Sequence, residues 1–308
     1  MIHINPKMAK LANPALKKFP DKMECDNCIL GKFHKHPHSG SRPSQMDFPW
    51  APGEYLTGDL FGPVLKSEGG ASYADINIDV KSRYVYVNLL ANKKDHFDAI
   101  EGVRSDLKAR SGKTLRFFKT DGDGIYTGGR ALDFYAKYDI RHIQSAPGDS
   151  ASNDMAERVI RTLIELTRTN LLHSGAPPNM WGECLLMVAH VWNNLATCVG
   201  KDGQTISRRS ILEGHTRKFD LSTLRAFGTK CFFMLTVQKK GGKKLALGPK
   251  AKAGVIIGIE DNMPAYRVLE MNPRGKAHRI PFAQTVFFLH RTRNLLTNDN
   301  KASQAGGW

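Results

Sequence analysis

Residues 114–124 read Thr-Leu-Arg-Phe-Phe-Lys-Thr-Asp-Gly-Asp-Gly, and this stretch decides the fold. Its first seven residues include threonines and two adjacent phenylalanines, which predict a strand. Asp121 and the glycines that follow it end that strand abruptly. A second strand is predicted at 140–145, then a loop at 146–152 and a long helix at 153–173 that carries Glu157 in its first turns. A strand-end Asp and a helix-borne Glu can converge on one pair of metal ions.

The residues before this stretch predict three strands and a helix. Strands are expected at 54–61, 73–80 and 84–90, and the short connections between them indicate an antiparallel meander. Apolar residues at helical spacing predict a helix at 96–110. Strand, helix and strand in this order are typical of a right-handed crossover. The fold class is therefore mixed α/β.

Three acids are candidate metal ligands: Asp59 late in the first strand, Asp121 and Glu157. If the first strand and the strand ending at Asp121 are neighbours, their carboxylates project from one region, and Glu157 can close the site from the helix. Each acid also has an ordinary interpretation, as a turn acid before Gly-Pro, an Asx-turn acid before glycine, or an i, i+4 partner of Arg161. Three other acids are weaker candidates, one as a substitute for Asp121 and two as solvated or structural residues: Asp123, Asp75 and Asp79.

The charge balance points to a polyanionic partner. The 308 residues carry 45 Lys and Arg against 29 Asp and Glu, a formal charge of +16. Nucleic acid is the first candidate and an anionic membrane surface is the second. No apolar run is long enough to span a membrane, and the N-terminus lacks the apolar core of a secretory signal. Five cysteines fit a reducing compartment better than a disulfide framework.

The C-terminal third is β-rich and basic. A helix is predicted at 181–195, a polar connection at 200–216, and strands at 231–237, 254–259, 266–271 and 280–289. No acid occurs in residues 221–259, although lysines are frequent there. Short strands with a lysine-rich loop predict a small barrel that contacts phosphate groups.

The N-terminal residues contain one metal-binding pattern. Cys25 and Cys28 have the Cys-x-x-Cys spacing of a tetrahedral zinc site, with His3, His34 or His36 as further ligands. The alternative is a pair of partly buried thiols beside a solvated His patch. The remaining cysteines lie in apolar surroundings, where burial is the default expectation: Cys184, Cys198 and Cys231.

Several motifs, in order along the chain, carry a resemblance to one family. They are His3 with Cys25-Asp26-Asn27-Cys28, Gly58-Asp59-Leu60-Phe61-Gly62-Pro63, Asp79 with Ser82-Arg83-Tyr84, Thr120-Asp121-Gly122-Asp123-Gly124-Ile125-Tyr126, Ser145-Ala146-Pro147 with Asn153-Asp154-Met155-Ala156-Glu157-Arg158, Leu224-Arg225-Ala226-Phe227-Gly228, and Pro249-Lys250-Ala251-Lys252-Ala253-Gly254. Together they resemble the integrase region of a copia-type long-terminal-repeat retrotransposon Pol polyprotein.

The chain departs from that family pattern at three places. The family's zinc module has two His and two Cys, and the sequence is expected to begin after its first His. Ile125 stands where the family commonly has Glu, and Asp154 where it commonly has Gly.

The resemblance implies a specific architecture. It implies an RNase H-like core, in which helices flank a mixed five-stranded sheet, with a small N-terminal zinc-type segment and a C-terminal SH3-like β-barrel. The implied divisions are a zinc-binding segment at 1–40, a linker at 41–53, the catalytic core with its C-terminal helices at 54–220, the barrel at 221–292 and a disordered tail at 293–308.

The resemblance also implies an activity, which is metal-dependent DNA strand transfer by an integrase. Mg²⁺ or Mn²⁺ would be held by Asp59, Asp121 and Glu157, and Zn²⁺ by His3, Cys25 and Cys28. The residues expected to contact DNA are Arg158, Arg161, Arg168, Lys239, Lys240, Lys243 and Lys244. The implied partners are element and target DNA and further copies of the chain, with no membrane. The implied location is the nucleus during integration and otherwise a cytoplasmic virus-like particle. The alternatives are a catalytically silent DNA-binding protein and a nuclease built on the same carboxylates.

Overall fold

The computed structural model describes residues 26, 49–145, 150–199, 205–216, 219–234, 250–261, 265–270, 278–283 and 286–287. The predicted zinc ligands His3, Cys25 and Cys28, the four lysines at 239–244 and the predicted tail at 293–308 lie outside these ranges. No helix in the described ranges is long and apolar enough to cross a membrane.

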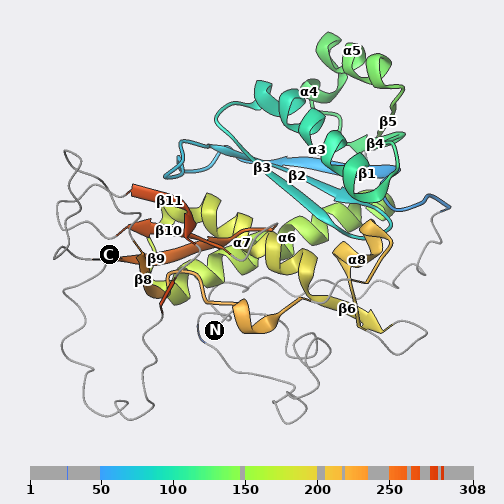
Figure 1. Ribbon diagram of the computed structural model, residues 1–308. Helices are drawn as coiled ribbons and strands as arrows, with labels where there is room; N and C mark the ends of the chain where they lie inside the picture. Colours follow the sequence, from blue (N-terminus) through green and yellow to red (C-terminus); the bar gives the residue numbers. More distant parts are fainter. Residues whose placement is uncertain are drawn as a thin grey trace, which may run out of the picture.

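The centre of the fold is a mixed five-stranded sheet (Figure 1). Its strands are β1 (Tyr55–Phe61), β2 (Tyr73–Asp79), β3 (Val85–Leu90), β4 (Phe117–Thr120) and β5 (Arg141–Gln144). They lie in the order β3-β2-β1-β4-β5. β1, β2 and β3 pair antiparallel, whereas β4 pairs parallel with both β1 and β5. The predicted meander and the predicted mixed α/β sheet are confirmed, and β1 and β4 are neighbours as the acid hypothesis requires.

Helices cover both faces of this sheet (Figure 1). One face is covered by α3 (His96–Ser111) and α5 (Gly129–Tyr138), which are joined through β4 and the short α4 (Gly124–Thr127). The other face is covered by α6 (Ser150–Ser174) and α7 (Trp181–Asn194). Because strand side chains alternate between faces, Ile76 of β2 packs towards α6 and α7, while Leu56 of β1 packs towards α3.

The helices α6 and α7 hold the sheet in place. α6 begins three residues before its predicted start at 153, and it buries Ala156 and Leu163 against the sheet. Asn193, near the end of α7, bonds the edge strand β3 twice. Its Oδ1 accepts from the N–H of Val85 at 2.8 Å, and its Nδ2 donates to the carbonyl of Val85 at 2.8 Å. These bonds satisfy backbone groups at an edge that would otherwise be open to another strand.

The predicted polar connection at 200–216 is wrong as a description of its structure. A two-stranded sheet forms from β6 (Ala196–Val199) and β7 (Thr205–Ser207), and α8 (Arg208–Glu213) follows it. The Ser207 hydroxyl caps α8 by accepting from the N–H of Ser210, and Gly214 ends the helix in the left-handed conformation. A helix of six residues is too short for hydrophobic periodicity to reveal it.

The C-terminal region forms a second five-stranded sheet, in the order β11-β10-β9-β8-β12. Its strands are β8 (Lys230–Met234), β9 (Ala251–Ile259), β10 (Tyr266–Glu270), β11 (His278–Ala283) and β12 (Val286–Phe287). The single strand predicted at 280–289 is wrong, because β11 pairs with β10 at one edge and β12 pairs with β8 at the other. One straight strand cannot reach both edges. Closure into an SH3-like barrel stays a prediction.

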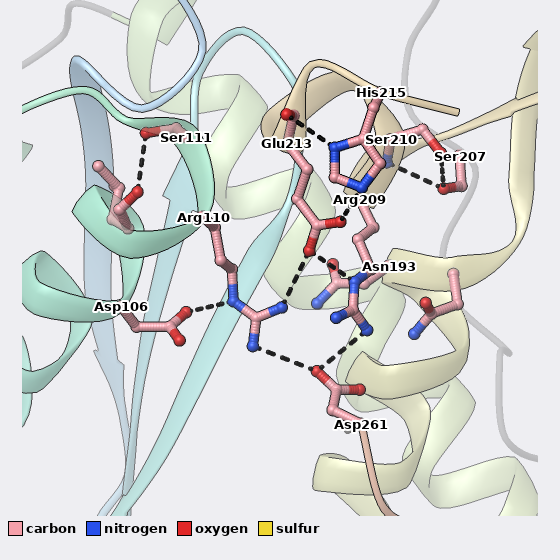
Figure 2. Close-up of polar contacts among 12 residues, drawn as sticks. Asp106, Arg110, Ser111, Asn193, Ser207, Arg209, Ser210, Glu213, His215 and Asp261 are labelled. Atoms are coloured by element: carbon pink, nitrogen blue, oxygen red, sulfur yellow. Dashed lines mark hydrogen bonds and ion pairs between the residues drawn. The ribbon is translucent and has the colours of Figure 1, made fainter. Parts of the chain in front are cut away.

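A charge cluster joins the C-terminal sheet to the core (Figure 2). Asp261 follows β9, and its carboxylate lies 3.6 Å from Nη2 of Arg110 on α3 and 3.5 Å from Nη1 of Arg209 on α8. Its other oxygen lies 2.5 Å from Nδ1 of His190 on α7. Both arginines also contact Oε1 of Glu213. Three helices of the core therefore bind one carboxylate of the C-terminal sheet.

Candidate active site

Asp59 and Asp121 are brought together by the parallel pairing of β1 with β4. Thr57 lies opposite Lys119 in that register. Continuing the register by two residues on each strand, 57 + 2 and 119 + 2, places Asp59 opposite Asp121. Neighbouring strands lie about 4.8 Å apart. Asp59 is also the register partner of Ile76, whose side chain packs towards α6 and α7. Asp59 is therefore on the sheet face covered by α6, and Asp121 follows directly after the end of the neighbouring strand β4.

The electrostatics of Asp59 show how close these acids are. Desolvation by burial raises the pKa of Asp59, and repulsion from Asp121, Glu157 and Asp123 raises it further, to about 6. The N–H of Leu60 donates to Asp59 Oδ1 at 2.7 Å and partly opposes the shift. A carboxylate that is destabilised by other carboxylates binds a proton or a cation more readily. The donor set therefore fits a hard divalent ion such as Mg²⁺.

The turn after β4 holds Asp121 in place. The N–H of Asp123 donates to Asp121 Oδ1 at 3.1 Å, which is an Asx-type turn. Asp123 caps α4 by accepting from the N–H of Ile125 at 3.2 Å and forms an ion pair with Lys93 at 2.8 Å. The hydrogen bond from Lys93 lowers the pKa of Asp123. Asp123 is therefore a turn and capping acid, which makes it a poor substitute for Asp121.

Glu157 lies near the start of α6, with an exposed side chain. Its charge contributes to the raised pKa of Asp59, so the helix does bring it towards the strand acids. Among the described residues, however, no three His, Cys, Asp or Glu side chains lie close enough to hold one metal ion together. The structure brings Asp59 and Asp121 together and leaves Glu157 at the margin of the pair.

The predicted DNA contacts that the structure describes lie on the solvent side of α6. Arg158, Arg161 and Arg168 are all exposed. Arg158 and Arg161 are three residues apart, so they are neighbours on the helix surface. These basic residues follow Glu157 along the same helix and present positive charge on its exposed side.

Two polar features near the acids escaped prediction from the sequence. Lys119 is only 5% exposed, although its register position places it on the same face as Asp121. Asp75 and His96 are fully buried on the opposite face of the sheet. The alternation of β2 identified the face that carries Asp75, and the helix at 96–110 was predicted to pack on the sheet, but neither pattern paired His96 with Asp75.

Asp79, the other weak candidate, is a structural residue. It is fully buried, and its carboxylate accepts from the N–H of Gly53 at 2.8 Å and from the hydroxyl of Ser82 at 2.6 Å. The predicted burial of Cys184 and Cys231 is confirmed. The side chain of Cys198 lies outside the described part of the chain.

Comparison with known proteins gives relatives of one kind. No family model matches the chain. It is 28% identical over 250 residues to the retrovirus-related Pol polyprotein from transposon TNT 1-94 of Nicotiana tabacum, an alignment that covers 79% of this chain and 18% of that protein. It is 29% identical over 209 residues to the transposon Ty1-LR3 Gag-Pol polyprotein of Saccharomyces cerevisiae, covering 67% of this chain and 12% of that protein. The chain thus spans less than a fifth of these relatives.

Comparison with solved structures gives partial matches. The HTLV-2 integrase catalytic core domain in complex with magnesium matches with a TM-score of 0.40 and 17% identity, over 52% of this chain and 97% of that one. A chain of a simian T-cell lymphotropic virus intasome matches with a TM-score of 0.45 and 14% identity, over 84% of this chain and 85% of that one. The sequence relatives confirm the resemblance found in the motifs: this chain is a homologue of the Pol polyproteins of Ty1/copia-type retrotransposons.

Proposed function

We propose that this chain is the integrase part of a retrotransposon polyprotein and joins element DNA to target DNA by strand transfer. The observation that carries the proposal is the pairing of β1 with β4, which brings Asp59 close to Asp121, together with the raised pKa of Asp59, which burial and then its acidic neighbours cause. The homology to Pol polyproteins supports it. The fold we propose is RNase H-like, with the C-terminal sheet as an SH3-like barrel.

The reaction would be an in-line displacement at phosphorus. A 3′-hydroxyl of the element DNA attacks a target phosphodiester, a new P–O bond forms, and the bond to the target 3′-oxygen breaks. The attacking hydroxyl loses its proton to water, and the departing oxygen gains one. Bound Mg²⁺ or Mn²⁺ would activate the attacking oxygen and stabilise the departing one. Asp59 and Asp121 would hold the ions, with Glu157 completing the set from α6.

The remaining residues bind and orient DNA in this proposal. Arg158, Arg161 and Arg168 present charge to phosphates beside the acids. The lysines at 239, 240, 243 and 244 would add contacts to the sugar-phosphate backbone, so target choice would depend weakly on sequence. His3, Cys25 and Cys28 would bind zinc in an N-terminal segment. The protein would act as a homo-oligomer in the nucleus and otherwise reside in cytoplasmic particles.

A strand-transfer assay with Mg²⁺ or Mn²⁺ tests this function, using wild type, Asp121→Asn and Asp133→Asn. Asp133 is an exposed acid of α5 and serves as the matched control. Loss of one group that stabilises charge at a reaction centre typically lowers the rate about 100-fold or more. The strand-transfer rate of Asp121→Asn should therefore fall by about that factor, whereas the rate of Asp133→Asn should stay near that of wild type. If wild type and Asp121→Asn both gave strand-transfer product only at the background level, the proposed enzymatic activity would be ruled out.

A catalytically silent DNA-binding protein is the second candidate. The observation in its favour is that Glu157 does not join the other acids in a three-residue metal site within the described ranges. In that case DNA binding would persist in wild type without strand-transfer products. An RNA–DNA hybrid substrate in the same assay separates an integrase, which should leave the hybrid intact, from a nuclease.

A further inference from the structure

Asp75 of β2 and His96, the first residue of α3, form a buried polar pair. Both are 0% exposed. Asp75 Oδ1 lies 3.1 Å from His96 Nδ1, and Asp75 Oδ2 accepts from Asn77 Nδ2 at 2.8 Å. Replacing a buried ionic pair with apolar residues is often neutral or stabilising. Stability alone is therefore a weak explanation for an acid and a histidine at this position.

The His96 ring contacts Tyr126, which is 1% exposed. The two rings meet edge to face, with centroids 5.1 Å apart and an interplanar angle of 89°. When Nδ1 donates to a carboxylate in a neutral imidazole, Nε2 is left as an acceptor. Neither His96 Nε2 nor the Tyr126 hydroxyl has a hydrogen-bond partner among the described residues. A buried acceptor and a buried donor thus lie on two rings in contact.

Tyr126 is linked to Asp121 through α4. The N–H of Tyr126 donates to the carbonyl of Asp123 at 2.9 Å, and the N–H of Asp123 donates to Asp121 Oδ1 at 3.1 Å. Lys93, three residues before His96, forms an ion pair with Asp123 at 2.8 Å. His96 at the start of α3 therefore supports the Asp121 turn from inside the core, and Lys93, just before α3, contacts it at the surface. The Lys93 pair is solvent-exposed and contributes little. The buried support of α4 comes from the contact of His96 with Tyr126 and from the Tyr135 hydroxyl, which donates to the carbonyl of Tyr126 at 3.2 Å.

We infer that Asp75 and His96 are positioning residues for Asp121. The carboxylate of Asp75 fixes the His96 ring, the ring fixes Tyr126 and α4, and α4 fixes the turn that carries Asp121. Neither residue touches substrate, because the pair lies on the sheet face opposite Asp59. The inference rests on the proposed function, since the position of Asp121 matters for catalysis only if that carboxylate binds a metal ion.

Hydrogen exchange of the amides at 122–127 tests the structural link without requiring activity. The informative variants are His96→Leu, which removes the ring, and Asp75→Val, which removes its anchor. Asp75→Asn is the conservative variant, because the amide oxygen of an Asn can still accept from His96 Nδ1. Its amide nitrogen can donate to Asn77 once the Asn77 amide has turned, so the second hydrogen bond is also kept. Leu107→Ala is the matched control. It creates a cavity at a fully buried position of α3, eleven residues from His96 and away from the turn.

The expected result is exchange at 122–127 about tenfold faster in His96→Leu and Asp75→Val, equivalent to about 1.4 kcal/mol. Asp75→Asn should stay within about twofold of wild type, and Leu107→Ala should leave the turn unchanged while it loosens the end of α3. Unchanged exchange in Asp75→Val, or an equal increase at the turn in Leu107→Ala, overturns the inference. The comparison between Asp75→Val and Asp75→Asn decides the matter even if His96→Leu does not fold.

Strand transfer supplies the second measurement. A misplacement of about 1 Å can cost on the order of 100-fold in rate, so kcat should fall in Asp75→Val while KM for DNA stays near wild type and Asp75→Asn recovers kcat. Normal kcat in a variant with a loosened turn would contradict the positioning role. If wild type itself shows no strand transfer, the proposed function fails, and the exchange result still reports whether the pair holds the turn.

Discussion

Asp261 and His190 lie 2.5 Å apart, oxygen to nitrogen, and this contact joins the C-terminal sheet to the central helix α7 of the core. Arg110 and Arg209 approach the same carboxylate from α3 and α8 (Figure 2). Arg209 is only 3% exposed, so its charge depends on Glu213 and Asp261 for compensation.

Replacing Asp261 with Asn should lower the free energy of unfolding by about 1–3 kcal/mol, because charged groups would lose a partner inside the interface. Urea denaturation at neutral pH measures this loss. Asp98→Asn is the control, since Asp98 pairs with Arg130 at an exposed site and should change stability by less than about 1 kcal/mol. Equal effects from both variants would show that the cluster does not fix the sheet.

The pKa of Asp261 predicts how the stability of the same interface changes at low pH. Burial raises this pKa, but the hydrogen bond and charge of His190, with Arg209 and Arg110, outweigh it and lower the pKa to about 2. Because the folded-state pKa is lowered, ionised Asp261 contributes its full stabilisation of the folded protein above about pH 4, the pKa of an unfolded Asp. This stabilisation is lost as pH falls through about 2. The acid-induced loss of stability should therefore be smaller in Asp261→Asn than in wild type.

The raised pKa of Asp59 predicts the opposite pH dependence. Its folded value of about 6 lies above the usual 3.8, so metal-free protein should lose stability as pH rises from about 4 through about 6. The loss should be about 1–3 kcal/mol, allowing for partial exposure. Thermal unfolding in chelator, compared with Asp59→Asn, measures it. Identical pH slopes in the two proteins would contradict the raised pKa of Asp59.

Metal binding should follow the same titration. A divalent cation competes with the proton on Asp59, so Mn²⁺ affinity should rise as pH increases through about 6. Titration of Mn²⁺ monitored by electron paramagnetic resonance gives the affinity at each pH. Asp59→Asn should abolish the rise together with most of the binding, whereas a pH-independent affinity in wild type would exclude Asp59 as a ligand.

Glu157→Gln should reduce strand transfer by about 100-fold or more if α6 carries the third ligand. Glu165→Gln, two turns further along α6, is the matched control and should keep near-normal activity. DNA binding by both variants should equal that of wild type. Retained activity in Glu157→Gln would restrict the site to the two strand acids.

Arg161→Ala should weaken DNA binding without altering sequence preference. Each lost phosphate contact lowers the slope of log affinity against log salt by about one. Fluorescence anisotropy at several salt concentrations gives the slope, and Arg130→Ala is the control, because Arg130 is engaged with Asp98. An unchanged slope in Arg161→Ala would exclude this face of α6 from the DNA path.

The sequence predicted the core elements well because their signals are local. The alternation of β2 and the long apolar stripe of α6 identify both elements, and the abrupt end of the strand before Gly122 located Asp121. The pairing of β1 with β4 was left as a condition by the sequence, and the structure supplies it. The local signals therefore identified Asp59 and Asp121 as candidates, and the strand pairing showed that they lie on neighbouring strands.

The sequence failed where tertiary contacts decide the outcome. The polar side chains of β2 suggested a structural or solvated role, and α3 buries them completely, which is what gives Asp75 and His96 a shared environment. α8 was missed because its stability comes from a cap and from the buried pair of Arg209 with Glu213. The division of 280–289 into β11 and β12 depends on the pairing of β12 with β8, a strand that is distant in sequence.

The parallel pairing of β1 with β4 also determines when the acidic pair can exist during synthesis. Asp59 and Asp121 are 62 positions apart, 121 − 59, and they meet only after the crossover through α3 has closed. Non-local parallel pairing is a slow step in folding because loop closure comes before the contacts that reward it. A nascent chain that has emerged only through α3 therefore has Asp59 without its partner, and a carboxylate pair able to attract metal ions arises only once β4 has docked.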